Sequence, residues 1–207
     1  MVKVVANQKK NNRVQMNRDF FQKIYNHPLI NTEVLNELIS WHEKINFEKG
    51  FAFLESGNIA NEYYLIESGL LRAYVHDFEG NEITTEFYST NESCIEVSSL
   101  FQRIPTKENI IALTDGTAWK MEFDKFQELF HKIEGFREWG RAGMSSRLFM
   151  YKERKIEMLI KSATERYKDL INDKPSIIQN AKIKHIASYL GITDTSLSRI
   201  RKEISLD

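Results

Sequence analysis

The 207-residue sequence contains 29 lysines and arginines and 29 aspartates and glutamates, so its formal net charge at pH 7 is zero. Its single cysteine, Cys94, excludes an internal disulfide and any cysteine-rich metal or iron–sulfur site within one chain, and its five histidines include no pair at helical ligand spacing. No apolar run approaches the roughly 20 residues that a membrane-spanning helix needs, and no signal-peptide pattern opens the chain. We therefore expect a cytoplasmic protein without a metal or other cofactor, long enough for two modest domains.

The first part of the chain predicts a tail followed by helices. Residues 1–15 are polar and basic, and we assign residues 1–18 to an N-terminal tail. Apolar residues then recur at helical spacing from Asp19 to Trp41, which predicts helical segments. An interruption is expected near Pro28, because the residue before a proline is biased away from helix.

Residues 45–121 have a different texture, with short runs of aromatic and β-branched residues separated by glycines or polar turns. This texture predicts strands, and residues 62–88 predict hairpin-linked strands that turn at residues 67–69 and 79–81. Strands at such spacing favour a compact antiparallel sandwich or barrel. No glycine-rich phosphate-binding motif of the dinucleotide or nucleoside-triphosphate type is present in the sequence.

The helical period returns at Asp124 and continues well beyond Tyr151. One face of this predicted helix resembles an impure heptad seam, which would be buried by pairing with a second copy of the chain. A monomer could instead lay the same stripe against its own strands, and the heptad spacing favours the dimer. The seam residues are Phe136, Gly143, Met150 and Glu157, with Trp139, Ser146 and Arg154 nearby.

Residues 183–200 carry the most specific pattern in the chain, after a short predicted helix that ends near Pro175. The run Ile183, Ile186, Ala187, Leu190 forms the buried stripe of a short helix. Gly191 follows where a left-handed cap would end that helix, and Thr193 offers a hydroxyl N-cap for the next one. Leu197 and Ile200 then give the second helix a narrow inner stripe. Together these features predict a helix-turn-helix.

The outer face of the second helix has the residue types that recognition helices use on DNA. Arg199 can bond both acceptors on a guanine edge, whereas the hydroxyls of Thr193 and Ser196 sit at the helix start, where phosphate contacts are usual. An ordinary helical hairpin with a solvated outer face is the alternative interpretation. The polar residues of this face are Asp194, Thr195, Ser198, Arg199 and Lys202.

The neutral total charge conceals a division between two parts of the chain. Residues 1–136 contain 14 basic and 20 acidic residues, while residues 137–207 contain 15 basic and 9 acidic residues. The basic part includes the predicted helix-turn-helix, and local positive charge is what phosphate binding requires. The charge division therefore favours DNA binding over a solvated hairpin.

The order of parts, strands followed by a long helix and a helix-turn-helix, resembles the Crp/Fnr family of bacterial transcription regulators. In the strand region the resemblance rests on Lys49-Gly50, Gly57, the run from Tyr64 to Tyr74, and Gly80. At the other end it rests on the runs Ala163–Tyr167 and Ile186–Lys202, in a form similar to regulators of Bacteroidetes-type bacteria.

This resemblance implies an α+β fold: a cyclic-nucleotide-binding-like β-roll as sensing domain in residues 19–135, a dimerisation helix in 136–160 and a DNA-binding domain in 161–207. It also implies a homodimer whose recognition helices enter successive major grooves, with double-stranded DNA and RNA polymerase as partners. Asp194, Thr195 and Arg199 would then read bases, and Thr193 and Ser196 would contact the backbone. No strand hairpin follows the recognition helix in the sequence, so we expect no terminal wing.

The resemblance is weakest where family members that bind cyclic AMP carry a Gly-Glu pair and an Arg-Ser pair. Glu96 and Val97 replace the first pair, and Thr106 and Lys107 stand in place of the second. A lysine meets a phosphate as a point charge and not as a fork, so we expect no cyclic AMP binding and leave open another small effector or none. The candidate effector residues are Arg103, Thr106, Lys107, Tyr151 and Lys152.

We therefore expect a dimeric, sequence-specific transcription regulator whose sensing domain biases its DNA-binding domains. The alternative is a ligand-binding or protein-interaction module whose helical tail serves dimerisation and no longer binds DNA. An enzyme is not expected, because the motifs assemble neither paired carboxylates, nor a nucleophile with a base, nor a metal cluster.

Overall fold

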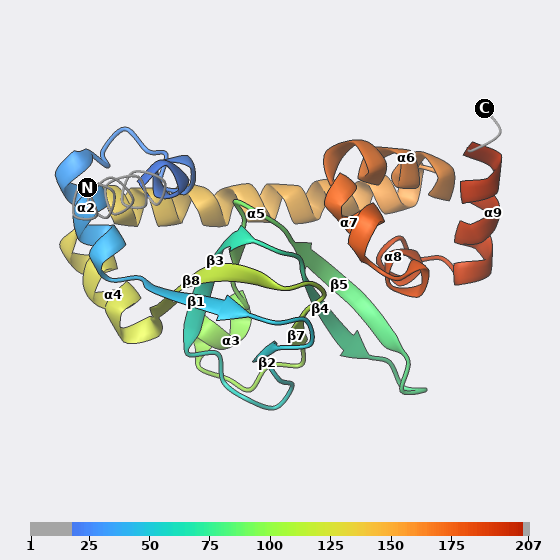
Figure 1. Ribbon diagram of the computed structural model, residues 1–207, viewed down its shortest axis with the longest axis horizontal. Helices are drawn as coiled ribbons and strands as arrows, with labels where there is room; N and C mark the ends of the chain where they lie inside the picture. Colours follow the sequence, from blue (N-terminus) through green and yellow to red (C-terminus); the bar gives the residue numbers. More distant parts are fainter. Residues whose placement is uncertain (1–17, 205–207) are drawn as a thin grey trace, which may run out of the picture.

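An antiparallel β-sandwich occupies the middle of the molecule, and one long helix, α5 (Glu134–Ile160), runs along it (Figure 1). The computed structural model describes residues 18–204, so the predicted tail, apart from its last residue, lies outside the described residues. The strands are β1 (Glu43–Phe47), β2 (Ala52–Leu54), β3 (Glu62–Ser68), β4 (Leu71–His76), β5 (Glu82–Tyr88), β6 (Ser93–Cys94), β7 (Asn109–Ala112) and β8 (Gly116–Glu122). The other helices are residues 18–24, α2 (Thr32–Ser40), α3 (Val97–Gln102), α4 (Phe123–Lys132), α6 (Ala163–Asp173), α7 (Pro175–Asn180), α8 (Ile183–Tyr189) and α9 (Asp194–Ile204).

The sandwich consists of two four-stranded sheets in the orders β1-β8-β3-β6 and β2-β7-β4-β5. All of their strand pairs are antiparallel, which confirms the predicted fold class. Alternate side chains of each strand point between the sheets, where burial of apolar surface stabilises the layer. The core between the sheets consists of Phe47, Phe53, Ile66, Leu71, Ala73, Tyr88, Cys94, Ile110, Ala112 and Ala118.

The two predicted hairpins have different outcomes. β4 and β5 pair around the turn that contains Gly80, as predicted. β3 and β4 do not pair, because β3 lies between β8 and β6 of one sheet and β4 between β7 and β5 of the other. The turn at Gly69 therefore crosses between the sheets, and the first hairpin prediction is wrong. Gly69 has a φ of +105°, and a Cβ there would lie 2.9 Å from the Phe47 ring, so this crossover requires glycine.

A second apolar core joins the N-terminal helices to α4 and the start of α5. It contains aromatic residues from distant parts of the chain, including Phe21, Trp119 and Phe136. Helices at residues 18–24 and at α2 flank Pro28, which agrees with the predicted interruption. The sequence does not predict the break between α4 and α5 at Ile133, because apolar residues continue at helical spacing through this position. In the structure Ile133 is extended and buried.

His42 is a buried, neutral side chain in this second core. Its Nδ1 lies 2.8 Å from the Leu38 carbonyl oxygen and its Nε2 lies 2.9 Å from the Tyr25 hydroxyl, so the ring donates to the carbonyl and accepts from the hydroxyl. Burial lowers the pKa of His42 from 6.5 to about 4. The neutral ring is thus part of the folded core.

We expect His42 to make folding stability fall with acid between pH 6.5 and pH 4. In that window the unfolded chain binds a proton that the folded core rejects, so the free energy of unfolding decreases by up to about 3 kcal/mol as pH falls. Urea denaturation at a series of pH values measures the slope. His42→Gln should reduce the slope without abolishing it, because burial also lowers the pKa of His185 to about 4. An unchanged slope in this variant would assign the effect to His185 and other groups.

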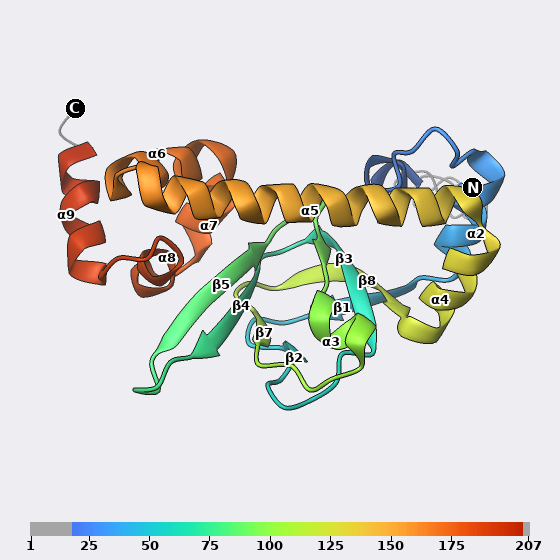
Figure 2. The same ribbon diagram turned by 180° about the vertical axis from the view of Figure 1, so that it is seen from behind.

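The C-terminal helices gather around the far end of α5, at the opposite end of the molecule from α2 and α4 (Figure 2). They share a third apolar core with the sandwich, to which the strand region contributes Leu70, Phe87 and Leu113. From the helices it takes Tyr167, Leu170, Ile177, Ile186, Ala187, Leu190, Leu197 and Ile200. The described residues include no helix long and apolar enough to cross a membrane.

Candidate functional site

Helices α8 and α9 form a tight two-helix unit at the C-terminal end of the molecule. Gly191 has a φ of +68° and ends α8, and the amide of Ile192 donates to the Ala187 carbonyl across the turn at 3.0 Å. The hydroxyl of Thr193 accepts from the amide of Ser196 at 3.2 Å and caps α9. These are the turn and the cap that the sequence pattern predicts.

The two faces of α9 differ sharply. Leu197 and Ile200 are buried in the third core, where they fix the helix against α8. Arg199 is exposed on the opposite face, and Lys202 lies one turn further on. All of the residues of the predicted recognition face are exposed, namely Asp194, Thr195, Ser198, Arg199 and Lys202. Thr193 and Ser196 are exposed at the helix start with their hydroxyls 2.9 Å apart.

The preceding helix, α8, docks on strand β5 of the sandwich. The Ser188 hydroxyl lies 2.8 Å from the Thr84 hydroxyl and also accepts from the Thr84 amide at 3.1 Å. The Thr84 hydroxyl accepts a bond of 2.8 Å from the fully buried Arg72, whose guanidinium also pairs with Glu82 at 2.6 Å. The sequence gives no signal for this contact, because the partners are 104 residues apart.

Arg154 on α5 joins three parts of the chain. Its guanidinium donates to the Thr85 carbonyl on β5 at 3.0 Å and to the Tyr189 carbonyl at the end of α8 at 3.1 Å. The same guanidinium lies over the Tyr189 ring, 3.7 Å from the centroid. The long helix, the sandwich and the two-helix unit are therefore held together at one side chain.

Part of the predicted heptad seam contacts this chain's own domains. Phe136 is fully buried in the second core, Trp139 donates from its indole nitrogen to the Ile24 carbonyl at 2.7 Å, and Arg154 bonds to the sandwich and α8. Gly143, Ser146 and Met150 of the same seam are exposed in the single chain, so pairing along this seam stays a prediction.

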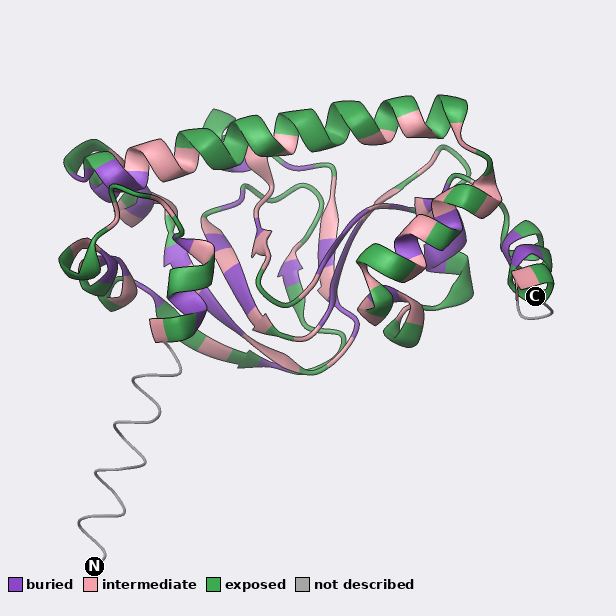
Figure 3. Ribbon diagram, turned by 90° about the horizontal axis from the view of Figure 1, so that it is seen from above, coloured by how far each residue is buried: buried purple, intermediate pink, exposed green. Residues whose placement is uncertain are grey.

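A different face of α5 is exposed. Figure 3, which views the molecule from above, shows that the helix is exposed along much of its length. We call five of its exposed large apolar residues, which lie on one side of the helix, the outer stripe. The outer stripe consists of Leu148 at 66% exposure, Phe149 at 66%, Ile156 at 45%, Leu159 at 80% and Ile160 at 74%. A contiguous apolar surface of this kind marks an interaction site.

The five candidate effector residues do not form one site. Arg103 is a structural contact, donating to the Ala60 carbonyl at 2.7 Å and lying over the Phe123 ring. Thr106 is buried and its hydroxyl accepts from the Glu108 amide, whereas Lys107 and Lys152 are exposed. The predicted grouping of these residues around one ligand is therefore not observed.

Tyr151 does face the sandwich, but its neighbours there are acidic. Burial raises the pKa of Tyr151, and the nearby carboxylates of Glu86 and Glu108 contribute to the shift. Burial likewise raises the pKa of Glu108, and the carboxylates of Glu96 and Glu86 raise it further. Sequence reasoning missed Glu108, although it directly follows Lys107. The space between the sandwich and α5 is thus rich in carboxylates.

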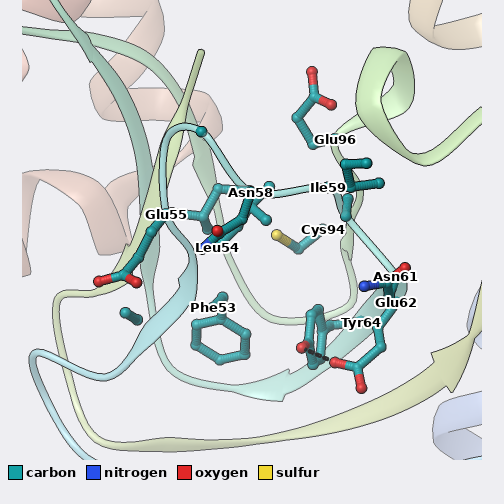
Figure 4. A pocket seen from close by; sticks show the side chains of 14 residues that line it. Phe53, Leu54, Glu55, Asn58, Ile59, Asn61, Glu62, Tyr64, Cys94 and Glu96 are labelled. Carbon is teal, nitrogen blue, oxygen red and sulfur yellow. Dashed lines mark hydrogen bonds between the residues drawn. The ribbon is translucent and has the colours of Figure 1, made fainter. Parts of the chain in front are cut away.

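A separate cavity lies at the open end of the sandwich, between the β2–β3 loop and the start of α3. It has a volume of about 680 Å³, and three carboxylates line it together with aromatic rings (Figure 4). The lining side chains include Phe53, Glu55, Asn58, Glu62, Tyr64, Cys94 and Glu96. None of the candidate effector residues lines it. Burial raises the pKa of the Cys94 thiol, as for a packed side chain.

Comparison with known proteins identifies the architecture. Residues 44–132 match the family model of the cyclic nucleotide-binding domain. The global regulator CLP of Xanthomonas campestris, described as responsive to c-di-GMP, superposes with a TM-score of 0.66 over 86% of this chain and 93% of that chain, at 13% identity. The fold is that of the Crp/Fnr regulators.

Two further solved structures support this assignment of the fold. A putative Crp/Fnr transcriptional regulator from Eubacterium rectale is 19% identical, with a TM-score of 0.66 over 85% of this chain and 84% of that chain. The catabolite activator protein of Thermus thermophilus is 16% identical, with a TM-score of 0.54 over 86% of each chain. No curated protein sequence matches the chain. The Crp/Fnr fold is thus shared at low sequence identity.

Proposed function

We propose that this protein is a homodimeric transcription regulator that reads a DNA sequence with the outer face of α9. The observation that carries the proposal is the arrangement of α9, which is capped, buried along one stripe and exposed along a polar and basic face. A helix fixed in this way can enter a major groove with Arg199 aimed at base edges. The Crp/Fnr fold supports the same assignment.

The outer stripe of α5 supports dimerisation. Its five apolar side chains, Leu148, Phe149, Ile156, Leu159 and Ile160, are exposed in the single chain. Pairing two α5 helices along this stripe would bury these side chains and relate the two α9 helices by a two-fold axis. DNA half-sites about 34 Å apart are the geometry that such dimers recognise.

The sensing domain is proposed not to bind cyclic AMP. Any phosphate held between the sandwich and α5 would approach Glu108, while the cations nearby already have partners: Arg154 pairs with Glu86 at 3.7 Å and Arg147 donates to the Ser93 hydroxyl at 2.9 Å. Lys107 is exposed, and its ammonium group cannot bind a phosphate with two parallel hydrogen bonds as a buried guanidinium would. Desolvation of the phosphate would therefore remain largely uncompensated.

Isothermal titration calorimetry checks this expectation. We expect no saturable heat up to about 100 µM cyclic AMP and no shift in thermal unfolding midpoint, because a ligand far below its dissociation constant adds almost nothing to the stability of the folded state. A micromolar dissociation constant that is lost in Lys107→Ala would overturn the expectation and restore nucleotide sensing.

Selection of bound fragments from random double-stranded DNA tests the DNA-binding proposal. We expect a near-palindromic motif, with affinity that falls steeply as salt rises because phosphate contacts release counterions. Mapping bound sites across the genome with and without candidate effectors would then connect the motif to regulation and to RNA polymerase. The cytoplasm, where bacterial DNA is accessible, is the expected compartment.

The second candidate function is a ligand-binding or protein-interaction module that dimerises through α5 without contacting DNA. The cavity of about 680 Å³ favours a binding role for the sandwich that does not depend on α9. Selection that recovers no enriched motif, together with no retention of DNA even at low salt, would support this module. We propose no catalytic activity for either candidate.

A further inference from the structure

A groove along one flank of α5 is lined almost entirely by apolar side chains. It has a volume of about 570 Å³ and runs between α3, α4 and the N-terminal half of α5. Five aromatic rings contribute to it, and Phe101 and Met144 remain 36% and 40% exposed although each is an apolar side chain. Its lining includes Phe101, Phe126, Phe130, Trp139 and Met144. Pockets of this size and character bind small organic molecules.

The rim of the groove is positively charged. Of its three arginines, Arg141 pairs with Glu138 at 2.5 Å and Arg147 donates to the hydroxyl of Ser93 at 2.9 Å. Arg137 is half-buried, lines the groove, and its guanidinium makes no hydrogen bond or ion pair with any residue between 18 and 204. One cation on the rim therefore has no anionic partner among residues 18–204, and a guanidinium fits a carboxylate with two parallel bonds.

Two glycines keep the groove open. A Cβ on Gly140 would lie 3.1 Å from the Phe130 ring and would narrow the space between α4 and α5. A Cβ on Gly143 would meet nothing within 4 Å, so packing within this chain does not explain a glycine there. Glycine is among the least favourable residues in a helix interior. The Phe130 ring accounts for the glycine at position 140, and the glycine at position 143 leaves open space beside the groove.

We propose that this groove binds a small aryl-alkyl carboxylate, with its ring among the aromatic side chains and its carboxylate on Arg137. A second copy of the chain fits less well, because it would bring the same arginine-rich rim and because no residue of the outer stripe lines the groove. The inference goes beyond the DNA-binding proposal, since it concerns ligand binding measured without DNA.

Calorimetry with 4-phenylbutyrate and its uncharged analogue 4-phenylbutan-1-ol tests the proposal on the full-length protein. We expect the acid to bind with a dissociation constant of about 10–100 µM, which is in the range for a ligand of this size, and about tenfold more tightly than the alcohol. Arg137→Gln should remove the preference for the acid while leaving alcohol binding unchanged, which also shows that the variant is folded.

Two further variants separate the groove from general effects. Met144→Trp should fill the groove and abolish binding of both compounds. Lys155→Gln, which removes a positive charge from the same helix about 27 Å from Arg137, should change neither affinity. Equal affinity for acid and alcohol in the wild type, or no saturable heat for either compound, would overturn the proposal. So would a change of oligomeric state in Met144→Trp without any ligand heat, because a partner chain would then occupy the groove.

Discussion

Leu148→Glu is expected to convert the proposed dimer into a monomer at micromolar concentration. Leu148 is 66% exposed in the single chain, so a partner helix that covers the outer stripe would bury it in both copies. Losing the burial of one leucine per copy costs about 1.5–3 kcal/mol each, which weakens dimerisation by about 100-fold or more. Two facing carboxylates add repulsion. Sedimentation equilibrium measures the change, and affinity for a selected operator should fall with it.

Gly143→Glu is the matched control, because it adds the same charge to the same helix on the seam that heptad spacing indicates. A Cβ at Gly143 meets nothing within 4 Å in this chain, so the fold should tolerate the change. We expect this variant to stay dimeric. A wild type that sediments as a monomer would refute the dimer altogether, and dissociation by Gly143→Glu alone would favour the heptad seam.

Arg199→Ala is expected to lose affinity mainly for the specific DNA site. A guanidinium on a guanine edge carries sequence information, and each such contact is worth about 1 to 3 kcal/mol. A dimer would lose two of these contacts. Electrophoretic mobility shifts on the selected operator and on scrambled DNA of the same length measure the difference. The ratio of the two affinities should shrink several-fold or more.

Lys202→Ala serves as the comparison, since removing a phosphate contact weakens binding to all sequences alike. Its expected signature is an unchanged specificity ratio and a salt slope reduced by about one per subunit. If both variants bind the operator as tightly as the wild type, α9 is not the reading helix.

The parts of the structure that could be predicted are those encoded locally. The stop at Gly191, the cap at Thr193 and the inner stripe of α9 all lie within one short stretch, and the structure contains each of them. The strand region was predicted for the same reason, because β-branched and aromatic runs between glycines bias the backbone directly.

Features set by distant contacts could not be predicted. The residues around Gly69 have the composition of a hairpin turn, and only the pairing of β3 with β8 shows that the chain changes sheets. Apolar residues at helical spacing continue through Ile133, because residues before and after the break enter the same core. Likewise, the face of α5 that meets the sandwich depends on partners such as Thr85, about 70 positions earlier in the chain.

The effector region shows the same limit. The pKa of Glu108 is raised by burial and by the carboxylates of Glu86 and Glu96, which lie on other parts of the chain. Nothing in the sequence near Lys107 indicates that these three carboxylates lie near one another. The groove along α5 could not be predicted either, because its aromatic lining comes from α3 and α4 as well as from α5.

The third apolar core and Arg154 bear on how the protein unfolds. Leu70, Phe87 and Leu113 of the strand region pack with the C-terminal helices in one apolar cluster. The Arg154 guanidinium of α5 also donates hydrogen bonds both to β5 of the sandwich and to the end of α8. When the C-terminal helices separate from the sandwich, apolar residues of both parts therefore become exposed together. In this docked arrangement the sandwich and the two-helix unit should melt in one cooperative transition, with matched amide exchange rates in β5 and α8.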